Sequence, residues 1–380
     1  MDSSPNSPAP AAHRAATSAG LRDPVRSRIG LDPEVAAAPA DRSVLRRAVA
    51  RALAAEGVVV APARWAQLVR DLVDELGGLG PLEALLRDPE VTDVLVNAHD
   101  EIWVERAGAL ERVDVAFDGP DHVRETLARV LGPLGVRLDR GRPFADAVLP
   151  GGVRLHALLP PLVGEPTVTL RRVAPVVPSW DELADAGAVP GPAADVLRQL
   201  VRDRANLVVT GRAGSGKTTL LARLLHEAAP DRIVVIEDAP ELRVSGGHVV
   251  HLQVVPPSAD GGMVADVASL LRNALRMRPD RLVIGEVRGA EVADLLQAMN
   301  TGHHGSMTTV HANGARDALT RLEGMALLAG VPIAAARAQL ATAVDAVATL
   351  QRASDGRRHV TAVVAVEVGE ATVRTRELWP

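Results

Sequence analysis

The chain has 380 residues, of which 47% are apolar, so it is long enough for two domains with substantial cores. A formal net charge of −5 and the absence of tyrosine argue against direct nucleic-acid binding, which favours positive charge and stacking side chains. Cysteine is absent, which excludes disulfides, thiolate chemistry and cysteine-ligated zinc.

Two segments precede the first predicted strand. Residues 1–40 are rich in proline, alanine, serine and arginine without a sustained apolar period, which predicts a disordered tail. Residues 41–78 follow a helical pattern that ends at Gly77-Gly78, which predicts a helical extension. The chain has neither the apolar core of a signal peptide nor an apolar run of about 18 residues. We therefore expect a soluble, cytoplasmic protein.

Residues 79–174 predict an N-terminal α/β domain. The stretches VTDVLVNA and EIWVERAG have the composition of strands, HVRETLARVLGPLG that of a helix, and VRLHALLPPL and TVTLRRV that of further strands. Residues 175–192 are interrupted by prolines, which indicates a linker. In residues 193–380, strands that are almost continuously apolar alternate with helices, and this predicts a mainly parallel sheet covered on both faces.

The stretch GRAGSGKT fits the phosphate-binding pattern G-x-x-x-x-G-K-[ST], between an apolar strand and a helix. Its glycines allow backbone N–H groups to surround a phosphate, to which the helix N-terminus adds partial positive charge. The motif predicts a nucleotide and Mg²⁺ site, with Lys217 on the β- and γ-phosphates and Thr218 on the metal. The predicted nucleotide-binding residues are Gly211, Gly214, Ser215, Gly216, Lys217, Thr218, Thr219 and His303.

Lys217 is the only lysine in the chain, so the other 41 of the 42 basic residues are arginines. A compact ammonium fits a small phosphate cradle that a planar guanidinium does not. We therefore predict that the lysine is retained for its shape.

Acidic residues follow two later apolar strands. RLVIGE ends at Glu286, and RIVVIEDAPEL places Glu237, Asp238 and Glu241 at the end of its strand. A single acid after a strand is usually a solvated loop residue or a helix cap. Two such strands after a phosphate loop favour instead carboxylates that face the ligand crevice at the carboxyl edge of the sheet.

Three histidines lie close together in TGHHGSMTTVHAN, namely His303, His304 and His311. No cysteine, H-E-x-x-H pattern or carboxylate at ligand spacing accompanies them, so a metal site is disfavoured. Surface or packed histidines are the simplest interpretation of any one of them. Beside a nucleotide site, the strand with Thr308, Thr309 and His311 more plausibly offers donors to the γ-phosphate.

Together these motifs resemble the type II/type IV secretion traffic ATPases, most closely the branch of tight-adherence (Flp) pilus and conjugal-transfer ATPases. The resemblance runs from about Leu79 to Val368 and includes GRAGSGKTTLL, VVIEDAPEL, NALRMRPDRLVIGEVRGAE and TGHHGSMTTVHAN, the family's Walker A, Asp box, Walker B and His box. It implies an N-terminal sensing domain linked to a RecA-like motor domain, a hexameric ring, and ATP with Mg²⁺. The four-cysteine module of some relatives cannot be present.

The resemblance also implies roles for individual residues. Glu286 would orient water, Thr218 and Glu237 would hold Mg²⁺, and His311, with His303, would sense the γ-phosphate. The arginines expected to approach the phosphates from the N-terminal domain, as further catalytic residues, are Arg154, Arg171 and Arg172.

The implied activity is an ATP-driven motor for pilus assembly or secretion. Its implied setting is a homohexamer bound at the inner membrane through a platform partner. A DNA-transfer motor of the conjugation type and a non-hydrolysing nucleotide-binding scaffold are the alternatives. The sequence does not identify the exported cargo, the membrane partner or the direction of work.

Overall fold

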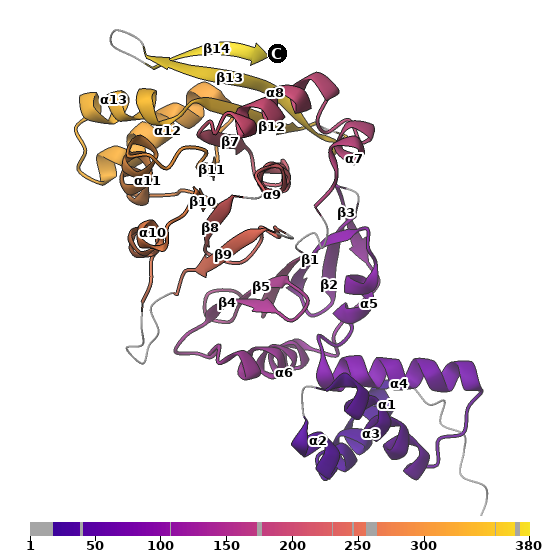
Figure 1. The fold of residues 1–380 in the computed structure, drawn as a ribbon. Helices are drawn as coiled ribbons and strands as arrows, with labels where there is room; N and C mark the ends of the chain where they lie inside the picture. The colour runs from indigo at the N-terminus through magenta and orange to yellow at the C-terminus, as the bar shows by residue number, and fades with distance from the viewer. Residues whose placement is uncertain are drawn as a thin grey trace, which may run out of the picture. The chain divides into compact units, whose positions relative to one another are not determined.

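The chain forms two compact units, residues Met1–Arg172 (unit 1) and Val173–Pro380 (unit 2). The structure is a computed structural model, shown in Figure 1. It describes residues 18–380 apart from 39–40, 107, 173–176, 230, 245–246, 256–263, 354 and 369–372. Among these described residues, no helix is long and apolar enough to cross a membrane.

Unit 1 begins with a small helical bundle that has its own core. Its helices are α1 (Ser18–Ile29), α2 (Pro33–Ala37), α3 (Arg42–Ala55) and α4 (Pro62–Gly77). Apolar side chains recur every three or four residues along α3 and α4, and Leu45, Val49 and Leu72 are buried between the helices. Asp41 caps α3 by accepting hydrogen bonds from the backbone N–H groups of its first turn.

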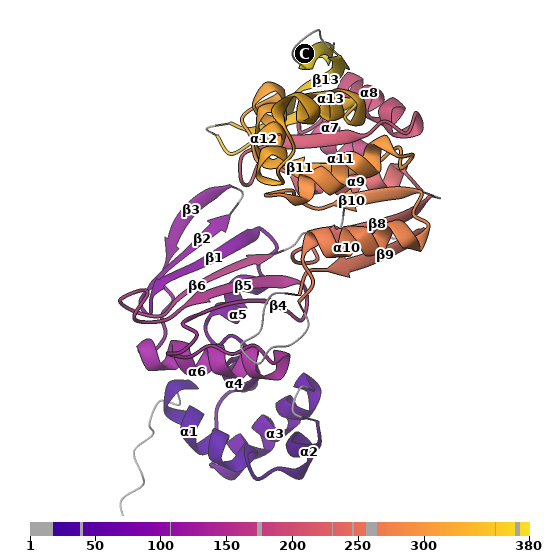
Figure 2. The same ribbon diagram turned by 90° about the vertical axis from the view of Figure 1, so that its left-hand side faces the viewer.

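The rest of unit 1 is an antiparallel sheet with the strand order β3-β2-β1-β6-β5-β4. Leu127 and Leu131 of α6 share a core with Val94 and Val96 of β1, so α6 covers one face of the sheet (Figure 2). The elements are α5 (Leu82–Arg87), β1 (Val91–Ala98), β2 (Glu101–Arg106), β3 (Ala109–Val113), α6 (Pro120–Leu131), η1 (Gly132–Leu134), β4 (Phe144–Leu149), β5 (Val153–Leu158) and β6 (Thr167–Arg172).

Charged side chains join the bundle to this sheet domain within unit 1. Glu75, at the end of α4, pairs with His122 of α6 and with Arg22 of α1, whose guanidinium also lies 2.9 Å from Asp118. Arg129 of α6 donates two hydrogen bonds to the carbonyl oxygen that follows α4, at 3.0 and 3.2 Å. Partly buried ion pairs therefore connect the two parts of this unit.

Unit 2 is built on a sheet with the strand order β14-β13-β12-β7-β11-β10-β8-β9. The strands from β12 to β9 pair in parallel, and β13 and β14 add an antiparallel hairpin. The elements are α7 (Trp180–Asp185), α8 (Gly191–Arg202), β7 (Leu207–Gly211), α9 (Lys217–Glu227), β8 (Arg232–Glu237), β9 (His248–Gln253), α10 (Val267–Ala274), η2 (Leu275–Met277), β10 (Arg281–Ile284), α11 (Glu291–Asn300), β11 (Met307–Val310), α12 (Ala315–Leu328), α13 (Ile333–Ala343), β12 (Ala346–Arg352), β13 (Arg358–Val368) and β14 (Val373–Trp379).

Helices cover both faces of this sheet (Figure 2). Leu207 and Val209 of β7 pack against α8 and α9, whereas Val208 between them packs with residues of α10 to α13. Burial on both faces explains why these strands are continuously apolar in sequence. The predicted α/β class and the two-sided parallel sheet are confirmed.

Two segments differ from the sequence predictions. The described part of the predicted tail is helical, because Val25 and Ile29, four residues apart, are buried in the bundle. The predicted linker 175–192 contains α7, and Trp180, Leu183 and Val189 are buried in the core of unit 2. Of that segment, residues 175–176 lie outside the described residues, as do residues 1–17 and 39–40 of the tail.

Candidate functional site

The phosphate loop connects the end of β7 to the start of α9. Gly214 and Gly216 have φ angles of +71° and +95°, which other residues rarely adopt, so the loop requires glycine at these two positions. Ser215 is fully buried, and its Oγ finds no hydrogen-bond partner among the described residues. The N–H groups of the first turn of α9 have no partners within the helix and, with the helix dipole, form an anion-binding site.

The ammonium of Lys217 lies inside this loop. Its Nζ donates hydrogen bonds to the carbonyl oxygens of Gly211 (3.0 Å) and Arg212 (3.1 Å). Burial lowers the pKa of Lys217, and the nearby carboxylates of Glu286 and Glu241 oppose that shift. A buried cation that donates to neutral carbonyl oxygens of its own loop can exchange them for phosphate oxygens.

His311, directly after β11, joins the phosphate loop to the acid that follows β10. Its Nδ1 lies 3.2 Å from Lys217 Nζ, and its Nε2 lies 2.8 Å from Glu286 Oε1. Burial and the charge of Lys217 lower the pKa of His311, so the imidazole is neutral near pH 7. Since Lys217 can only donate, Nδ1 accepts and the ring proton is assigned to Nε2, facing Glu286.

Glu286 is positioned by an arginine that sequence reasoning did not single out. Arg288 Nη2 lies 2.6 Å from Glu286 Oε2, and its Nη1 lies 3.3 Å from Asp238. The other oxygen of Glu286, Oε1, is buried, and the Nε2–H of His311, 2.8 Å away, is not aligned for a hydrogen bond to it. The sequence feature that could have indicated this role is the position of Arg288, two residues after the acid at the end of an apolar strand.

Glu237, the predicted metal ligand, organises the loop after β8, and its role toward Mg²⁺ stays a prediction. Its Oε1 accepts hydrogen bonds from the backbone N–H groups of Glu241 (3.0 Å) and Leu242 (2.9 Å), so this carboxylate shapes the loop after β8. Glu241, on the same loop, lies beside Thr218, whose Oγ1 donates to its Oε2 at 3.3 Å. A hydroxyl beside a carboxylate is a donor set that suits Mg²⁺, which takes oxygen ligands and retains several waters.

His303 lies at the other edge of the sheet. Parallel strands carry the phosphate loop and Glu286 at their carboxyl ends, and His303 precedes β11, at the amino edge. There its Nδ1 lies 3.3 Å from the carbonyl oxygen of Ala298, and its own carbonyl accepts from Ser306. The whole of β11 separates it from His311, and its assignment to nucleotide binding stays a prediction.

Arg154, Arg171 and Arg172 lie on β5 and β6 of unit 1. Arg154 and Arg171 are direct partners across these strands. Arg171 donates to Asp93 at 2.7 Å, and Arg172 donates to the carbonyl oxygen of Leu86. That these arginines approach the nucleotide stays a prediction.

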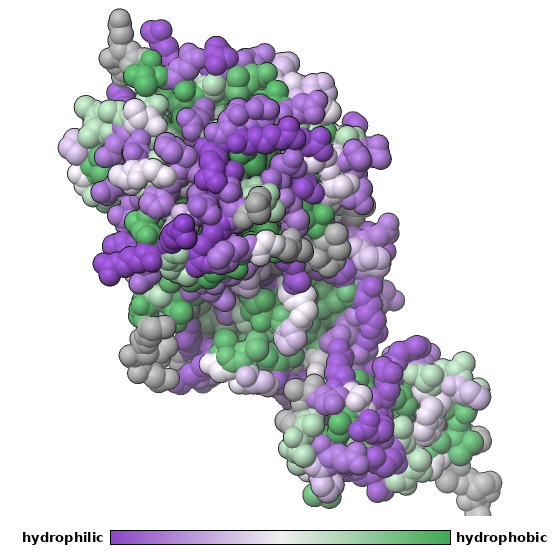
Figure 3. Space-filling model, in the orientation of Figure 1, coloured by the Kyte–Doolittle hydropathy of each residue, from purple (hydrophilic) through white to green (hydrophobic). Residues whose placement is uncertain are grey.

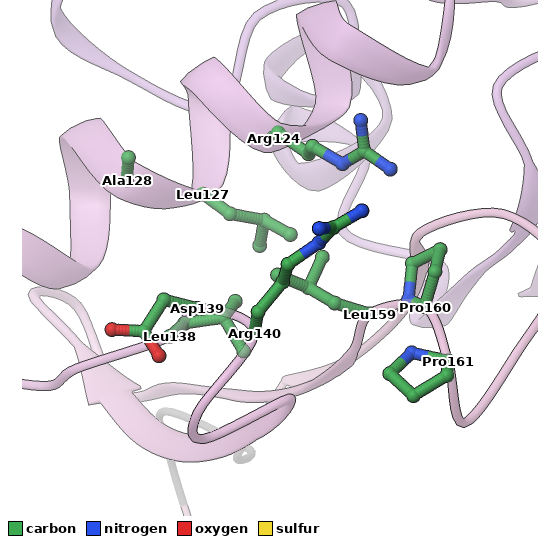
Figure 4. Close-up of a pocket in the computed structure, with 9 residues that line it drawn as sticks. All are labelled: Arg124, Leu127, Ala128, Leu138, Asp139, Arg140, Leu159, Pro160 and Pro161. Carbon is green, nitrogen blue, oxygen red and sulfur yellow. The ribbon is translucent and has the colours of Figure 1, made fainter.

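A cavity of about 710 Å³ lies in unit 1, apart from the predicted motifs. Leu127 of α6, Leu159 and Pro160 form apolar walls, and the side chains of Arg124 and Arg140 extend on one side of the cavity (Figure 4). In the space-filling view, hydrophobic residues gather on the sheet domain of unit 1, whereas unit 2 presents a mostly hydrophilic surface (Figure 3). None of the residues that line the cavity belongs to the phosphate loop or to the acids around it.

The fold and the site of unit 2 define a P-loop ATPase with a RecA-like motor domain. The model of the type II/IV secretion system protein family matches residues 75–374, and the chain belongs to this family. The predicted family and the ATPase class are thereby confirmed. Residues 18–74, which include most of the helical bundle, precede the match.

Two relatives and one solved structure illustrate the similarity. The chain is 41% identical over 319 residues to a putative conjugal transfer protein of Mycobacterium tuberculosis (strain H37Rv), covering 82% of this chain and 91% of that protein. It is 34% identical over 297 residues to the conjugal transfer protein TrbB of Rhizobium radiobacter, covering 77% and 88%. The ATPase DotB of Legionella pneumophila has the same fold, with a TM-score of 0.54 at 20% identity over 75% and 79% of the two chains.

Proposed function

We propose that this ATPase is a homohexameric motor that drives pilus assembly or export through an inner-membrane platform protein. The observation that carries the proposal is the contact series from Lys217 through His311 to Glu286. It joins three motifs at the carboxyl edge of the sheet. Phosphate binding at Lys217 can therefore change the position of Glu286, the acid that acts on water.

Each side chain has a defined task in this proposal. Lys217 exchanges the carbonyl oxygens of Gly211 and Arg212 for phosphate oxygens, and His311 then loses its donor and responds to the γ-phosphate. Glu286, held by Arg288, orients the attacking water. Thr218, with Glu241 beside it, would hold Mg²⁺, which neutralises charge on the β- and γ-phosphates.

The relatives support the setting of the motor. The two described above are named conjugal transfer proteins, and the family description covers type II and type IV secretion. We place the protein beside the tight-adherence and conjugal-transfer branches, at the cytoplasmic face of the inner membrane. The net charge of −5 favours protein partners over direct contact with DNA.

Phosphate release by the purified chain, measured over a concentration series beside Glu286→Gln, tests the proposal. We expect specific activity to rise with protein concentration, because assembly completes the motor, and Glu286→Gln to lose activity by about 100-fold or more while still binding ATP. A wild type that binds ATP but is inactive at every concentration, with and without membranes, would favour a non-hydrolysing scaffold. Turnover that DNA stimulates and salt suppresses would favour a DNA-transfer motor.

A further inference from the structure

An arginine pair lies on the flank of the phosphate loop opposite the acids. β12 runs parallel to β7 with Leu350 beside Gly211, so the end of β12 passes the start of the loop. β13 returns antiparallel to β12, and Arg352 and Arg358 are direct partners across the hairpin. Residues directly opposite in an antiparallel pair have side chains on the same face. Two positively charged side chains are thus placed together beside the phosphate loop.

Distances confirm that this hairpin borders the loop. A β-carbon added at Gly214 would lie 3.4 Å from Nη1 of Arg352, and one added at Gly216 would lie 3.8 Å from Cδ of Arg358. Both arginines are half-buried. The guanidinium of Arg352 and the aliphatic part of Arg358 therefore flank the two left-handed glycines that shape the loop.

The strand order places β7 between β12 on one side and β11, β10 and β8 on the other. His311, Glu286 and Glu241 follow these last three strands, so the metal and the terminal phosphates belong to that flank. The flank beside β12 is left for the α-phosphate and the nucleoside.

Aromatic residues are scarce on the nucleoside side. The aromatic residues of unit 2 are Trp180, which is buried beneath Arg198 and Arg223, and Trp379 in β14 at the sheet edge. A guanidinium plane can stack on a base and donate to a phosphate with the same group. We propose that Arg352 and Arg358 bind the α-phosphate and the nucleoside of the nucleotide. This inference rests on the proposed nucleotide site.

The test is equilibrium titration of the full chain with Mg-ADP and with a non-hydrolysable ATP analogue. The double variant Arg352→Gln and Arg358→Gln should bind both nucleotides with lower affinity. The dissociation constants should rise by a similar factor, about ten-fold or more for each charged hydrogen bond lost. The KM for ATP should rise by about the same factor, with kcat much less affected, because the contact is the same in the ground and transition states. Arg352→Lys with Arg358→Lys keeps the charge and should recover part of the affinity.

Arg357→Gln is the matched control, because Arg357 is adjacent in the chain but exposed and paired with Asp355 at 2.6 Å. It should leave both affinities unchanged. Unchanged ADP affinity in a double variant that unfolds at the wild-type temperature would overturn the inference. A loss confined to the ATP analogue would also overturn it, since that result places the pair at the γ-phosphate. A wild type that binds neither nucleotide would instead contradict the proposed function.

Discussion

At the scale of single residues, the solitary lysine is confined by its surroundings. Two loop carbonyls and the His311 ring lie within 3.2 Å of Lys217 Nζ, and only 7% of the residue is exposed. A guanidinium is wider and planar, so it cannot occupy the same position without displacing the loop.

Lys217→Arg should therefore reduce phosphate release by about 100- to 1,000-fold, the usual effect of removing one preorganised donor. The chain should still unfold at close to the wild-type temperature. Arg212→Lys is the control, since it makes the opposite exchange in the same loop and should retain activity. The side chain of Arg212 donates a hydrogen bond to Asn313 at 3.0 Å. Normal turnover by Lys217→Arg would show that the lysine is an accident of composition.

The pH dependence of hydrolysis follows from His311. Burial disfavours the protonation of this imidazole most, and the positive charges of Lys217, Arg288 and Arg321 also disfavour it. Glu286 favours protonation but does not outweigh these effects, so the pKa of His311 lies below the ordinary 6.5. Protonation places a second positive charge against Lys217 and removes the acceptor at Nδ1. Activity should therefore fall only at pH values below 6.5. His311→Gln should lack this acid limb, and a wild-type limb centred above 6.5 would contradict the assignment.

Sequence reasoning located the phosphate loop, Glu286 and His311 because each is next to an apolar strand whose direction fixes the edge of the sheet. It grouped His303 with His311 because they are close in the chain, although the strand β11 separates them in space. It could not show that backbone N–H groups of the following loop bind Glu237, because the direction of a carboxylate depends on local backbone geometry.

At the scale of elements, the junction between α4 and α6 depends on a partly buried carboxylate. Burial of Glu75 would raise its pKa, but the interactions with His122 and Arg22 together lower it. A carboxylate with a depressed pKa stabilises the fold above its unfolded value of about 4.5, and this contribution is lost as the pH falls through the folded pKa.

Glu75→Gln should therefore lower the melting temperature at neutral pH by several degrees, as expected for about 1–3 kcal/mol. The difference from wild type should shrink as the pH is lowered through the depressed pKa of Glu75. Glu125→Gln is the control, because Glu125 is half exposed and its pair with Arg26 contributes at most about 1 kcal/mol. Equal melting temperatures for wild type and Glu75→Gln at neutral pH would argue against this role of the ion pairs.

Elements with strong periodicity could be predicted, and those stabilised mainly by tertiary contacts could not. The segment of α1 contains Pro24 and many charges, and its burial of Val25 depends on α3 and α4 being present. The segment of α7 was interpreted as a linker because prolines flank it. Ser179 and Glu182 form a capping box, which is a sequence pattern that predicts the start of a helix. The prolines around it led to the linker prediction instead.

At the scale of the whole molecule, the two units have separate cores. Every residue assigned here to nucleotide binding lies in unit 2. A chain of residues 173–380 should consequently fold and bind ADP within about three-fold of the full chain, since domains with their own cores fold independently.

Hydrolysis by the same truncated chain tests the predicted arginines of unit 1. Loss of charge-neutralising arginines should reduce phosphate release by about 1,000-fold or more. Full-chain variants Arg154→Gln and Arg171→Gln should reproduce that loss without changing ADP affinity. Undiminished hydrolysis by residues 173–380 would remove Arg154, Arg171 and Arg172 from the catalytic set.

The burial of the only lysine has a practical consequence for chemical labelling. Apart from the α-amino group, Lys217 is the only primary amine in the protein, and its lowered pKa increases the fraction of the unprotonated, nucleophilic form. An acylating reagent at mildly alkaline pH therefore reports on one internal position. The rate of acylation would measure how often the phosphate loop opens, and protection by a ligand would measure the occupancy of that loop.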